Sequence, residues 1–511
     1  MIDSTPPAPE KRLTLDQAVA LAGERLRAGD IGAADALYRE VLKAKPDHLE
    51  ALERAAAVAA RSGRGPAAEA AARDALASRG MGAAHDLLTG NALRALGLLD
   101  QAIVLYKRAV ERDPNLADAH CNMGATYKEI GWLKEAVLAY KAALRADPNH
   151  ALAQSNLGVA LKESGDLEGA VAAYEKAIAA DPGMVQAHCN LGVALKELGR
   201  TEEAVAAYEK AIALKPDFAA ALCNLGNALA ALGRTGEAVA AYERTIAASP
   251  RFAQAYSNIG AIRLKEGDAE SALAMCDRFL SVHGPDARLL SLKAVALDEL
   301  GRRDAVRRLV DFDRLIRPVR IAPPAGYADL RAFNDALADH VARHPTMKFA
   351  PPEHATRYGH HSGELLAGNK GAVGELEAII VDAVAGYIDE VLGDPAHPFL
   401  AHRPQLTSIS AWGVVMESSG HQVSHTHPTA WLSGVYYVRL PEVVKSADAG
   451  HAGWIEFGDS GAEYAFRTVK PETKAFQPEE GKMFLFPSYL YHRTIPFEAA
   501  EKRICIAFDV W

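Results

Sequence analysis

The chain has 511 residues, of which 49% are hydrophobic and 24% are charged, and its formal net charge is -9 at pH 7. A chain of this length exceeds one hydrophobic core, so we expect at least two domains. The acidic balance gives no basic face for nucleic acid, and no stretch is apolar enough to span a membrane. The N-terminus has no secretory apolar segment and the five cysteines form no C-x-x-C pair, which favours a cytoplasmic protein.

Prolines recur at a fixed interval through the first three-fifths of the chain. The series with a spacing of 34 residues is Pro114, Pro148, Pro182, Pro216 and Pro250. Within each period, one position holds only glycine or alanine, which is expected where two helices cross closely. A tyrosine recurs sixteen residues after that position, at Tyr38, Tyr106, Tyr140, Tyr174, Tyr208 and Tyr242. The pattern predicts stacked helical hairpins, each of which buries its apolar face against the next.

This period and these positions resemble the tetratricopeptide repeat family. The resemblance implies about nine repeats over residues 15–318, stacked into a right-handed all-α superhelix that recruits a protein or peptide. We expect residues 1–14, which precede the pattern, to be disordered.

Asparagine recurs at the sixth position of the first helix in successive repeats, at Asn122, Asn156, Asn190, Asn224 and Asn258. The row is similar to the asparagine ladder of O-linked N-acetylglucosamine transferases, which implies amide side chains that bind a peptide backbone in the groove. Asparagine is also common at this position in tetratricopeptide sequences, so a purely structural role is the alternative.

The period ends at Pro318, and residues 319–400 read as a helical connector. Amphipathic patterns predict helices over 327–344 and 371–392, which we expect to pack under the sheet that follows. The polar segment between them contains His360 and His361. Because adjacent residues on a strand point to opposite faces, we expect no metal site there.

From residue 401 the chain is rich in short β-forming runs, at 407–416, 431–440, 453–457, 482–486 and 502–510. So many short strands predict an antiparallel sandwich or jelly roll. His425 and His427 are separated by one residue, so on an extended segment they share a face. His492 lies on a later strand and can complete a metal site with them.

The order of elements, with the motifs H-T-H-P, L-S-G-V-Y-Y-V and F-P-S-Y-L-Y-H, resembles the prolyl-hydroxylase-like Fe(II)- and 2-oxoglutarate-dependent oxygenases. The resemblance implies a double-stranded β-helix (jelly-roll) domain over 401–511 that uses Fe(II), 2-oxoglutarate and O2. His425 and His492 match the two histidine ligands of that family. His427 stands where the family has a carboxylate, so the expected ligands are three neutral imidazoles, a set that also suits zinc. Alternative ligands nearby are His421, Glu417 and Glu456.

The resemblance also implies a basic residue on the last strand that binds the far carboxylate of 2-oxoglutarate. Arg503 lies 11 residues after His492 and matches it, because a guanidinium pairs with a carboxylate through two hydrogen bonds. Tyr437 matches a strand tyrosine that hydrogen-bonds the same carboxylate, and Ser433 and Thr494 are weaker candidates.

Two functions are therefore open. In the first, the repeats recruit a protein or peptide that the jelly roll hydroxylates. In the second, the domain has lost turnover, the H-x-H change is a symptom of that loss, and the chain is an interaction scaffold.

Overall fold

The computed structural model describes residues 13–61, 75, 82–349, 355–368, 370–446, 450–464 and 467–511. Residues 1–12 of the segment expected to be disordered lie outside the described residues. The chain divides into two compact units, Met1–Ala238 and Val239–Trp511. None of the described helices is long and apolar enough to cross a membrane.

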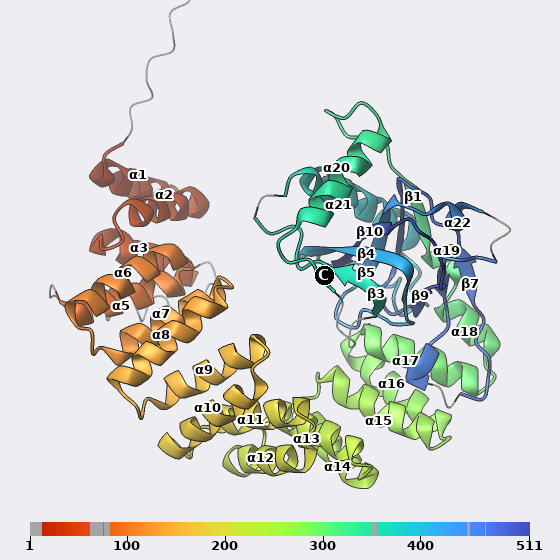
Figure 1. Cartoon of the computed structure of the whole chain (residues 1–511), viewed down its shortest axis with the longest axis horizontal. Coiled ribbons are helices and arrows are strands. Elements are labelled where there is room, and N and C mark those ends of the chain that lie inside the picture. The colour runs from red at the N-terminus through yellow and green to blue at the C-terminus, as the bar shows by residue number, and fades with distance from the viewer. Residues whose placement is uncertain are drawn as a thin grey trace, which may run out of the picture. The chain divides into compact units, whose positions relative to one another are not determined.

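The first unit consists of helical hairpins (Figure 1). Its helices pack in sequential antiparallel pairs, as the 34-residue period predicts: α1 (Leu15–Arg27), α2 (Ile31–Ala44), α3 (Leu49–Arg61), α5 (Ala83–Ala95), α6 (Leu99–Arg112), α7 (Ala117–Glu129), α8 (Leu133–Ala146), α9 (Ala151–Glu163), α10 (Leu167–Ala180), α11 (Val185–Glu197), α12 (Thr201–Leu214) and α13 (Ala219–Ala231). Helix α14 (Thr235–Ala248) crosses the division between the units.

In the central repeats the small position lies against the repeating tyrosine. The side chain of Tyr174 is fully buried, and a Cβ atom added at Gly158 would lie 2.6 Å from its ring. The same relation joins Gly192 to Tyr208. A close crossing of the two helices therefore requires glycine on one side and an aromatic ring that fills the space on the other.

The second unit begins with repeat helices and continues into the β-domain. Its helices are α15 (Ala253–Lys265), α16 (Ala269–His283), α17 (Ala287–Glu299), α18 (Arg303–Leu309), α19 (Phe312–Leu315), α20 (Leu330–Arg343), α21 (Ala372–Val391) and α22 (Glu442–Lys445). Helices α20 and α21 form within the ranges predicted for the connector. Helix α20 packs on the sheet, where Tyr436 donates a hydrogen bond of 2.6 Å to Asn334.

Two antiparallel sheets form the β-domain, as expected for a jelly roll. The larger has the order β1-β8-β5-β10-β4-β3-β2 and the smaller β7-β6-β9. The bounds are β1 (Arg317–Arg320), β2 (Lys348–Phe349), β3 (Thr356–His361), β4 (Ile409–Gln422), β5 (Leu432–Arg439), β6 (Ile455–Phe457), β7 (Lys474–Phe476), β8 (Lys482–Pro487), β9 (His492–Thr494) and β10 (Arg503–Val510).

Three strands of the larger sheet come from before residue 401. Strand β1 contains residue 318, the expected end of the repeats, and pairs with β8. Strands β2 and β3 lie in the segment that reads as polar, and β3 pairs with β4. The sequence of β3, Thr-Arg-Tyr-Gly-His-His, lacks the alternation of a half-buried strand, because its side chains face a polar cavity and solvent.

The last repeat helices are fixed to the β-domain by buried polar contacts. The side chain of Arg467 is 8% exposed and forms ion pairs with Asp298 and with Glu299 of α17. The hydroxyl groups of Tyr489 and Tyr387 donate to the carbonyls of Leu309 (2.6 Å) and Leu315 (2.9 Å). Repeat helices and sheet therefore belong to one packed body within the second unit.

Candidate metal centre

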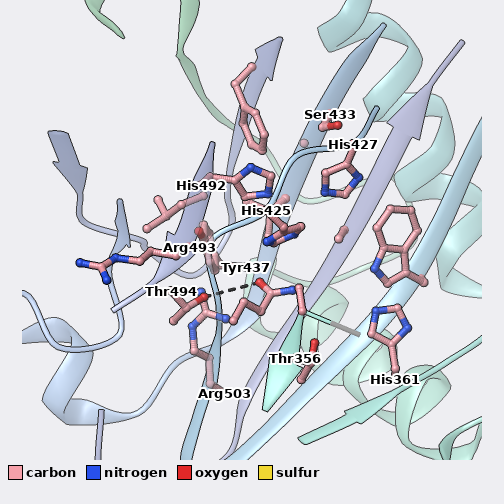
Figure 2. Close-up of a pocket in the computed structure, with 18 residues that line it drawn as sticks. Thr356, His361, His425, His427, Ser433, Tyr437, His492, Arg493, Thr494 and Arg503 are labelled. Carbon is pink, nitrogen blue, oxygen red and sulfur yellow. Dashed lines mark hydrogen bonds between the residues drawn. The ribbon is translucent and has the colours of Figure 1, made fainter. Parts of the chain in front are cut away.

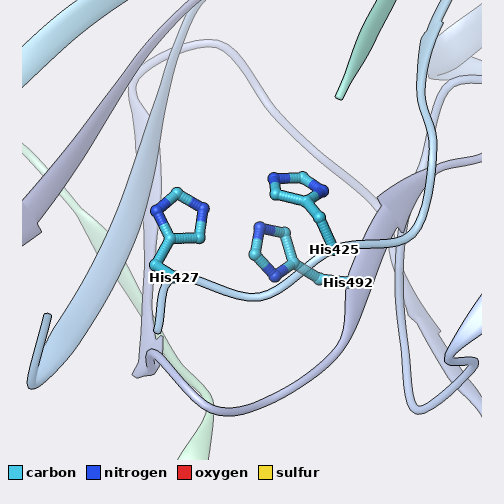
Figure 3. Close-up of side chains that lie close together, drawn as sticks. All are labelled: His425, His427 and His492. Carbon is cyan, nitrogen blue, oxygen red and sulfur yellow. The ribbon is translucent and has the colours of Figure 1, made fainter. Parts of the chain in front are cut away.

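Three histidine rings converge between the two sheets (Figure 3). One ligand atom from each of His425, His427 and His492 lies within 4.8 Å of the others, and within the described parts of the chain this is the one such group of ligating side chains. The ring centroids of His425 and His492 are 4.3 Å apart, and each lies 5.2 Å from that of His427. The arrangement can hold one metal ion from one side, as the H-x-H spacing and the distant third histidine predict.

Backbone hydrogen bonds hold the three rings in place. His425 and His492 form an isolated antiparallel bridge, with N–H···O distances of 3.1 and 3.0 Å. The N–H of His427 donates to the carbonyl of Ser488 at 3.0 Å. The segment that follows β4 is thus bound at two points to the segment that leads into β9, which brings residues 65 positions apart to one site.

Each ring has its Nδ1 atom bound to an oxygen that can only accept a hydrogen bond. The acceptors are the carbonyls of Val423 for His425 (2.8 Å) and Leu490 for His492 (3.1 Å), and the carboxylate of Asp509 for His427 (2.8 Å). Nδ1 must therefore carry the proton, which leaves the lone pair of Nε2 available to a metal ion. This outer hydrogen bond is the usual support of a metal-binding histidine.

The surroundings keep the rings of His425 and His492 neutral. Burial, followed by the nearby His427 ring, lowers the pKa of His425 to about 4. Burial, followed by the rings of His425 and His427, lowers the pKa of His492 well below its usual value. A metal ion binds unprotonated imidazole, so these groups do not need to lose a proton near neutral pH before they bind it.

A cavity of about 170 Å³ extends from the three histidines between the sheets (Figure 2). Arg503 from β10 and Tyr437 from β5 line it, as does Thr356 from β3. Trp412 forms part of its wall and lies in a stack between the rings of His361 and His427, with centroid distances of 5.9 and 5.7 Å.

Arg503 is a buried cation without an anion. Its side chain is 1% exposed, and no carboxylate pairs with it among the residues that the structure describes. Its Nη1 atom lies 3.6 Å from the sulfur atom of Met416 and 3.5 Å from that of Cys505, its guanidinium lies 5.2 Å from the centroid of the Tyr437 ring, and its Nε atom has no hydrogen-bond partner there. A buried charge of this kind is costly unless an anion compensates it, so the cavity fits a carboxylate ligand.

Two neutral hydroxyl groups in the same cavity can also hydrogen-bond a ligand. The hydroxyl groups of Tyr437 and Thr356 are buried and lack hydrogen-bond partners among the described residues. Burial raises the pKa of Tyr437, so its hydroxyl keeps the proton that it can donate. Thr356 was missed at the sequence level because β3 lies far from the recognisable motifs, and no local pattern marks it.

The remaining candidates have other contacts. Ser433 donates to Asp509 at 2.6 Å, and Thr494 lines the cavity 3.5 Å from the side-chain oxygen of Gln422. Among the alternative ligands, Glu417 pairs with Lys502 (2.7 Å), Glu456 pairs with Arg493 (2.6 Å), and His421 lies on β4 opposite Arg357. In the described part of the chain, these three do not join the group of ligating side chains.

The asparagine row is partly engaged within the repeats. All five side chains are half-buried. The amide of Asn122 donates to Asn91 at 2.8 Å, and those of Asn156 and Asn224 approach the sulfur atoms of Cys121 and Cys189 in the preceding repeat (3.8 and 4.0 Å). These contacts link neighbouring repeats, so the row has at least a structural use.

Comparison with solved structures returns repeat proteins. MamA is 30% identical over 32% of this chain and 96% of its own, with a TM-score of 0.31. PilF of Pseudomonas aeruginosa is 25% identical over 38% of this chain and 88% of its own, with a TM-score of 0.34. YrrB, described as a TPR protein with an unusual peptide-binding site, is 24% identical over 39% of this chain and 100% of its own, with a TM-score of 0.32. No curated protein matches the chain.

Comparison with protein families matches repeat families to the helical part of the chain and a different family to its C-terminal part. Repeat families described as "TPR repeat" and "Tetratricopeptide repeat" match residues 19–80, 90–131, 117–150, 160–199, 194–233 and 223–288. The family described as "Putative 2OG-Fe(II) oxygenase" matches residues 410–509, which include all three histidines and Arg503. The chain is a tetratricopeptide repeat protein that carries a C-terminal domain of this 2OG-Fe(II) oxygenase family.

Proposed function

We propose that the C-terminal domain is an Fe(II)- and 2-oxoglutarate-dependent dioxygenase that hydroxylates a protein or peptide recruited by the repeats. One observation carries this proposal. Three Nε2 lone pairs and a buried guanidinium that has no carboxylate partner among the described residues face the same cavity. That combination suits a metal ion together with a ligand that has a carboxylate at its far end.

In this proposal His425, His427 and His492 hold the iron through Nε2. Arg503 binds the far carboxylate of 2-oxoglutarate, and the hydroxyls of Tyr437 and Thr356 donate to it. The iron, when bound, supplies the redox chemistry by which O2 converts 2-oxoglutarate to succinate and CO2 and a substrate C–H to C–OH.

The protein's own contribution is orientation and the exclusion of water. The bridge between His425 and His492 fixes two ligands on adjacent backbone segments. The apolar wall, which includes Phe486 and Ile455, limits access of water to the iron side of the cavity. A low-dielectric surrounding strengthens every charge interaction within it.

The repeats suit recruitment of a protein partner, because stacked hairpins present an extended surface. We place the peptide along the face of the first unit that carries Asn122, Asn156, Asn190 and Asn224. The donors of several of these amides are engaged between repeats, so their carbonyl oxygens are the groups that we expect to accept hydrogen bonds from a peptide backbone.

Two measurements test the proposal. Anaerobic loading should give one Fe(II) per chain, and the loaded protein should release succinate from 2-oxoglutarate and O2. His492→Ala should lose both properties, whereas His421→Ala, outside the ligand group, should keep them. Tight zinc binding without succinate release would favour hydrolytic chemistry, and failure to bind any metal would favour the interaction scaffold.

A further inference from the structure

Asp509 is a buried carboxylate in contact with one of the three histidines. It lies on β10 and is 6% exposed. Its Oδ2 atom accepts from Nδ1 of His427 at 2.8 Å, and its Oδ1 atom accepts from the hydroxyl of Ser433 at 2.6 Å. No lysine or arginine pairs with it among the residues that the structure describes. Its negative charge is therefore directed at the His427 ring and at whatever that ring binds.

The three histidines differ in this respect. His425 and His492 donate to neutral backbone carbonyls, and only His427 has a charged acceptor. A hydrogen bond to an ionised group is roughly twice as strong as one between neutral groups, and it makes the opposite ring nitrogen a better electron donor. His427 is also the residue that replaces the expected carboxylate ligand. The site thus contains a carboxylate, that of Asp509, which lies on the Nδ1 side of the His427 ring and not at the metal-facing Nε2 atom.

We propose that Asp509 is the positioning residue for His427: it fixes the ring in the orientation and tautomer that present Nε2 to the metal. It also supplies, through that ring, the negative charge that three neutral ligands lack. Ser433 holds the second oxygen of the carboxylate and so fixes its plane. This inference rests on the metal site of the proposed function but does not depend on which reaction the metal supports.

Metal affinity tests the charge directly. The probe is Co(II) alone, titrated into metal-free full-length protein and followed by visible absorption. Asp509→Asn can still accept from His427 but carries no charge, so we expect affinity to fall about 10- to 100-fold. Ser433→Ala keeps the carboxylate and should lose less. Affinity of Asp509→Asn within twofold of the unaltered protein would overturn the proposal.

A second measurement needs no variant, which matters if Asp509→Asn does not fold. Nitrogen-15 NMR of the metal-free protein, recorded at a pH where the His427 ring is neutral, should show its single proton on Nδ1. A neutral His427 ring with its proton on Nε2 would contradict the positioning role. The two proposals also fail separately. A protein that binds Co(II) tightly but releases no succinate would contradict only the oxygenase reaction. An Asp509→Asn variant with unchanged affinity for Co(II) would contradict only the role of Asp509.

Discussion

Replacement of Arg503 by methionine should greatly weaken the binding of 2-oxoglutarate. In the complex, the guanidinium and the far carboxylate would form a buried ion pair, and removal of one partner of such a pair costs about 3–5 kcal/mol. At about 1.4 kcal/mol per tenfold, the dissociation constant should rise between about 10² and 10⁴-fold. The affinity for the metal alone should stay unchanged, because Arg503 does not belong to the ligand group.

The same substitution should not destabilise the ligand-free protein. Arg503 has no carboxylate partner among the described residues, and its Nη1 atom contacts two sulfur atoms. Methionine fills a similar volume beside these atoms and the Tyr437 ring without a buried charge. Replacement of buried charges by apolar side chains of similar volume is often neutral or stabilising by about 1–4 kcal/mol.

Calorimetric titration of 2-oxoglutarate into Co(II)-loaded protein measures the first effect, and denaturant unfolding without ligand measures the second. Arg493→Met is the matched control. Arg493 also lines the cavity, but its side chain is 37% exposed and paired with Glu456 and Asp459. The Arg493→Met variant should bind 2-oxoglutarate with nearly the affinity of the unaltered protein. If Arg503→Met bound the ligand within threefold of the unaltered protein, the guanidinium would not be the carboxylate partner.

Three further substitutions test the packing within each of the two units. Gly158→Ala should destabilise the repeats by about 1–3 kcal/mol in denaturant unfolding, because the buried Tyr174 ring leaves no room for a methyl group. Arg467→Ala should cost about 3–5 kcal/mol in the second unit, because it leaves Asp298 buried without its partner. His397 is buried, and burial lowers its pKa below the usual 6.5. The unfolded chain thus takes up the proton first, and stability present above about pH 6.5 is lost as the pH falls. His397→Gln should reduce the difference in unfolding free energy between about pH 7.5 and about pH 5.5.

Exposed counterparts serve as controls for these substitutions. A Cβ atom at Gly236 meets no atom within 4 Å, so Gly236→Ala should stabilise its helix by up to about 1 kcal/mol. Arg307 and Glu472 form an exposed ion pair, so Arg307→Ala should cost less than about 1 kcal/mol. Equal losses for buried and exposed positions would show that the packing arguments are wrong, as would an unchanged pH response of His397→Gln.

The parts of this protein that the sequence predicts are those with a local or periodic signal. The 34-residue period locates the repeat helices, and the glycine positions follow from the close crossing that the structure shows. His425 and His427 could be paired from their spacing alone, since alternate residues of an extended segment share a face. His492 is a candidate third ligand from its place on a later predicted strand, whereas Arg503 could be added only because the motifs around it resemble a known family.

The parts that could not be predicted depend on long-range contacts. Asp509 meets His427 across 82 residues, and nothing in the pattern of β10 distinguishes it from a residue at the edge of the sheet. Thr356 lies on a strand whose composition reads as a polar loop, and it pairs with Gln422 of β4, more than 50 residues later in the chain. Such contacts are set by sheet order, which composition and periodicity do not encode.

The charges of two buried residues, Asp509 and Arg503, explain why a histidine at position 427 in place of a carboxylate does not have to mean that activity is lost. Asp509 contributes one negative charge and Arg503 one positive charge, so the charges of these two buried residues sum to zero in the ligand-free cavity. An Fe(II) ion and the dianion of 2-oxoglutarate add two charges of each sign, and the sum stays at zero. An aspartate in place of His427 would leave an uncompensated negative charge in the occupied site. Because either ligand alone leaves two uncompensated charges in a low-dielectric cavity, the metal and 2-oxoglutarate should each raise the other's affinity. Equal affinity for 2-oxoglutarate with and without the metal would contradict this account.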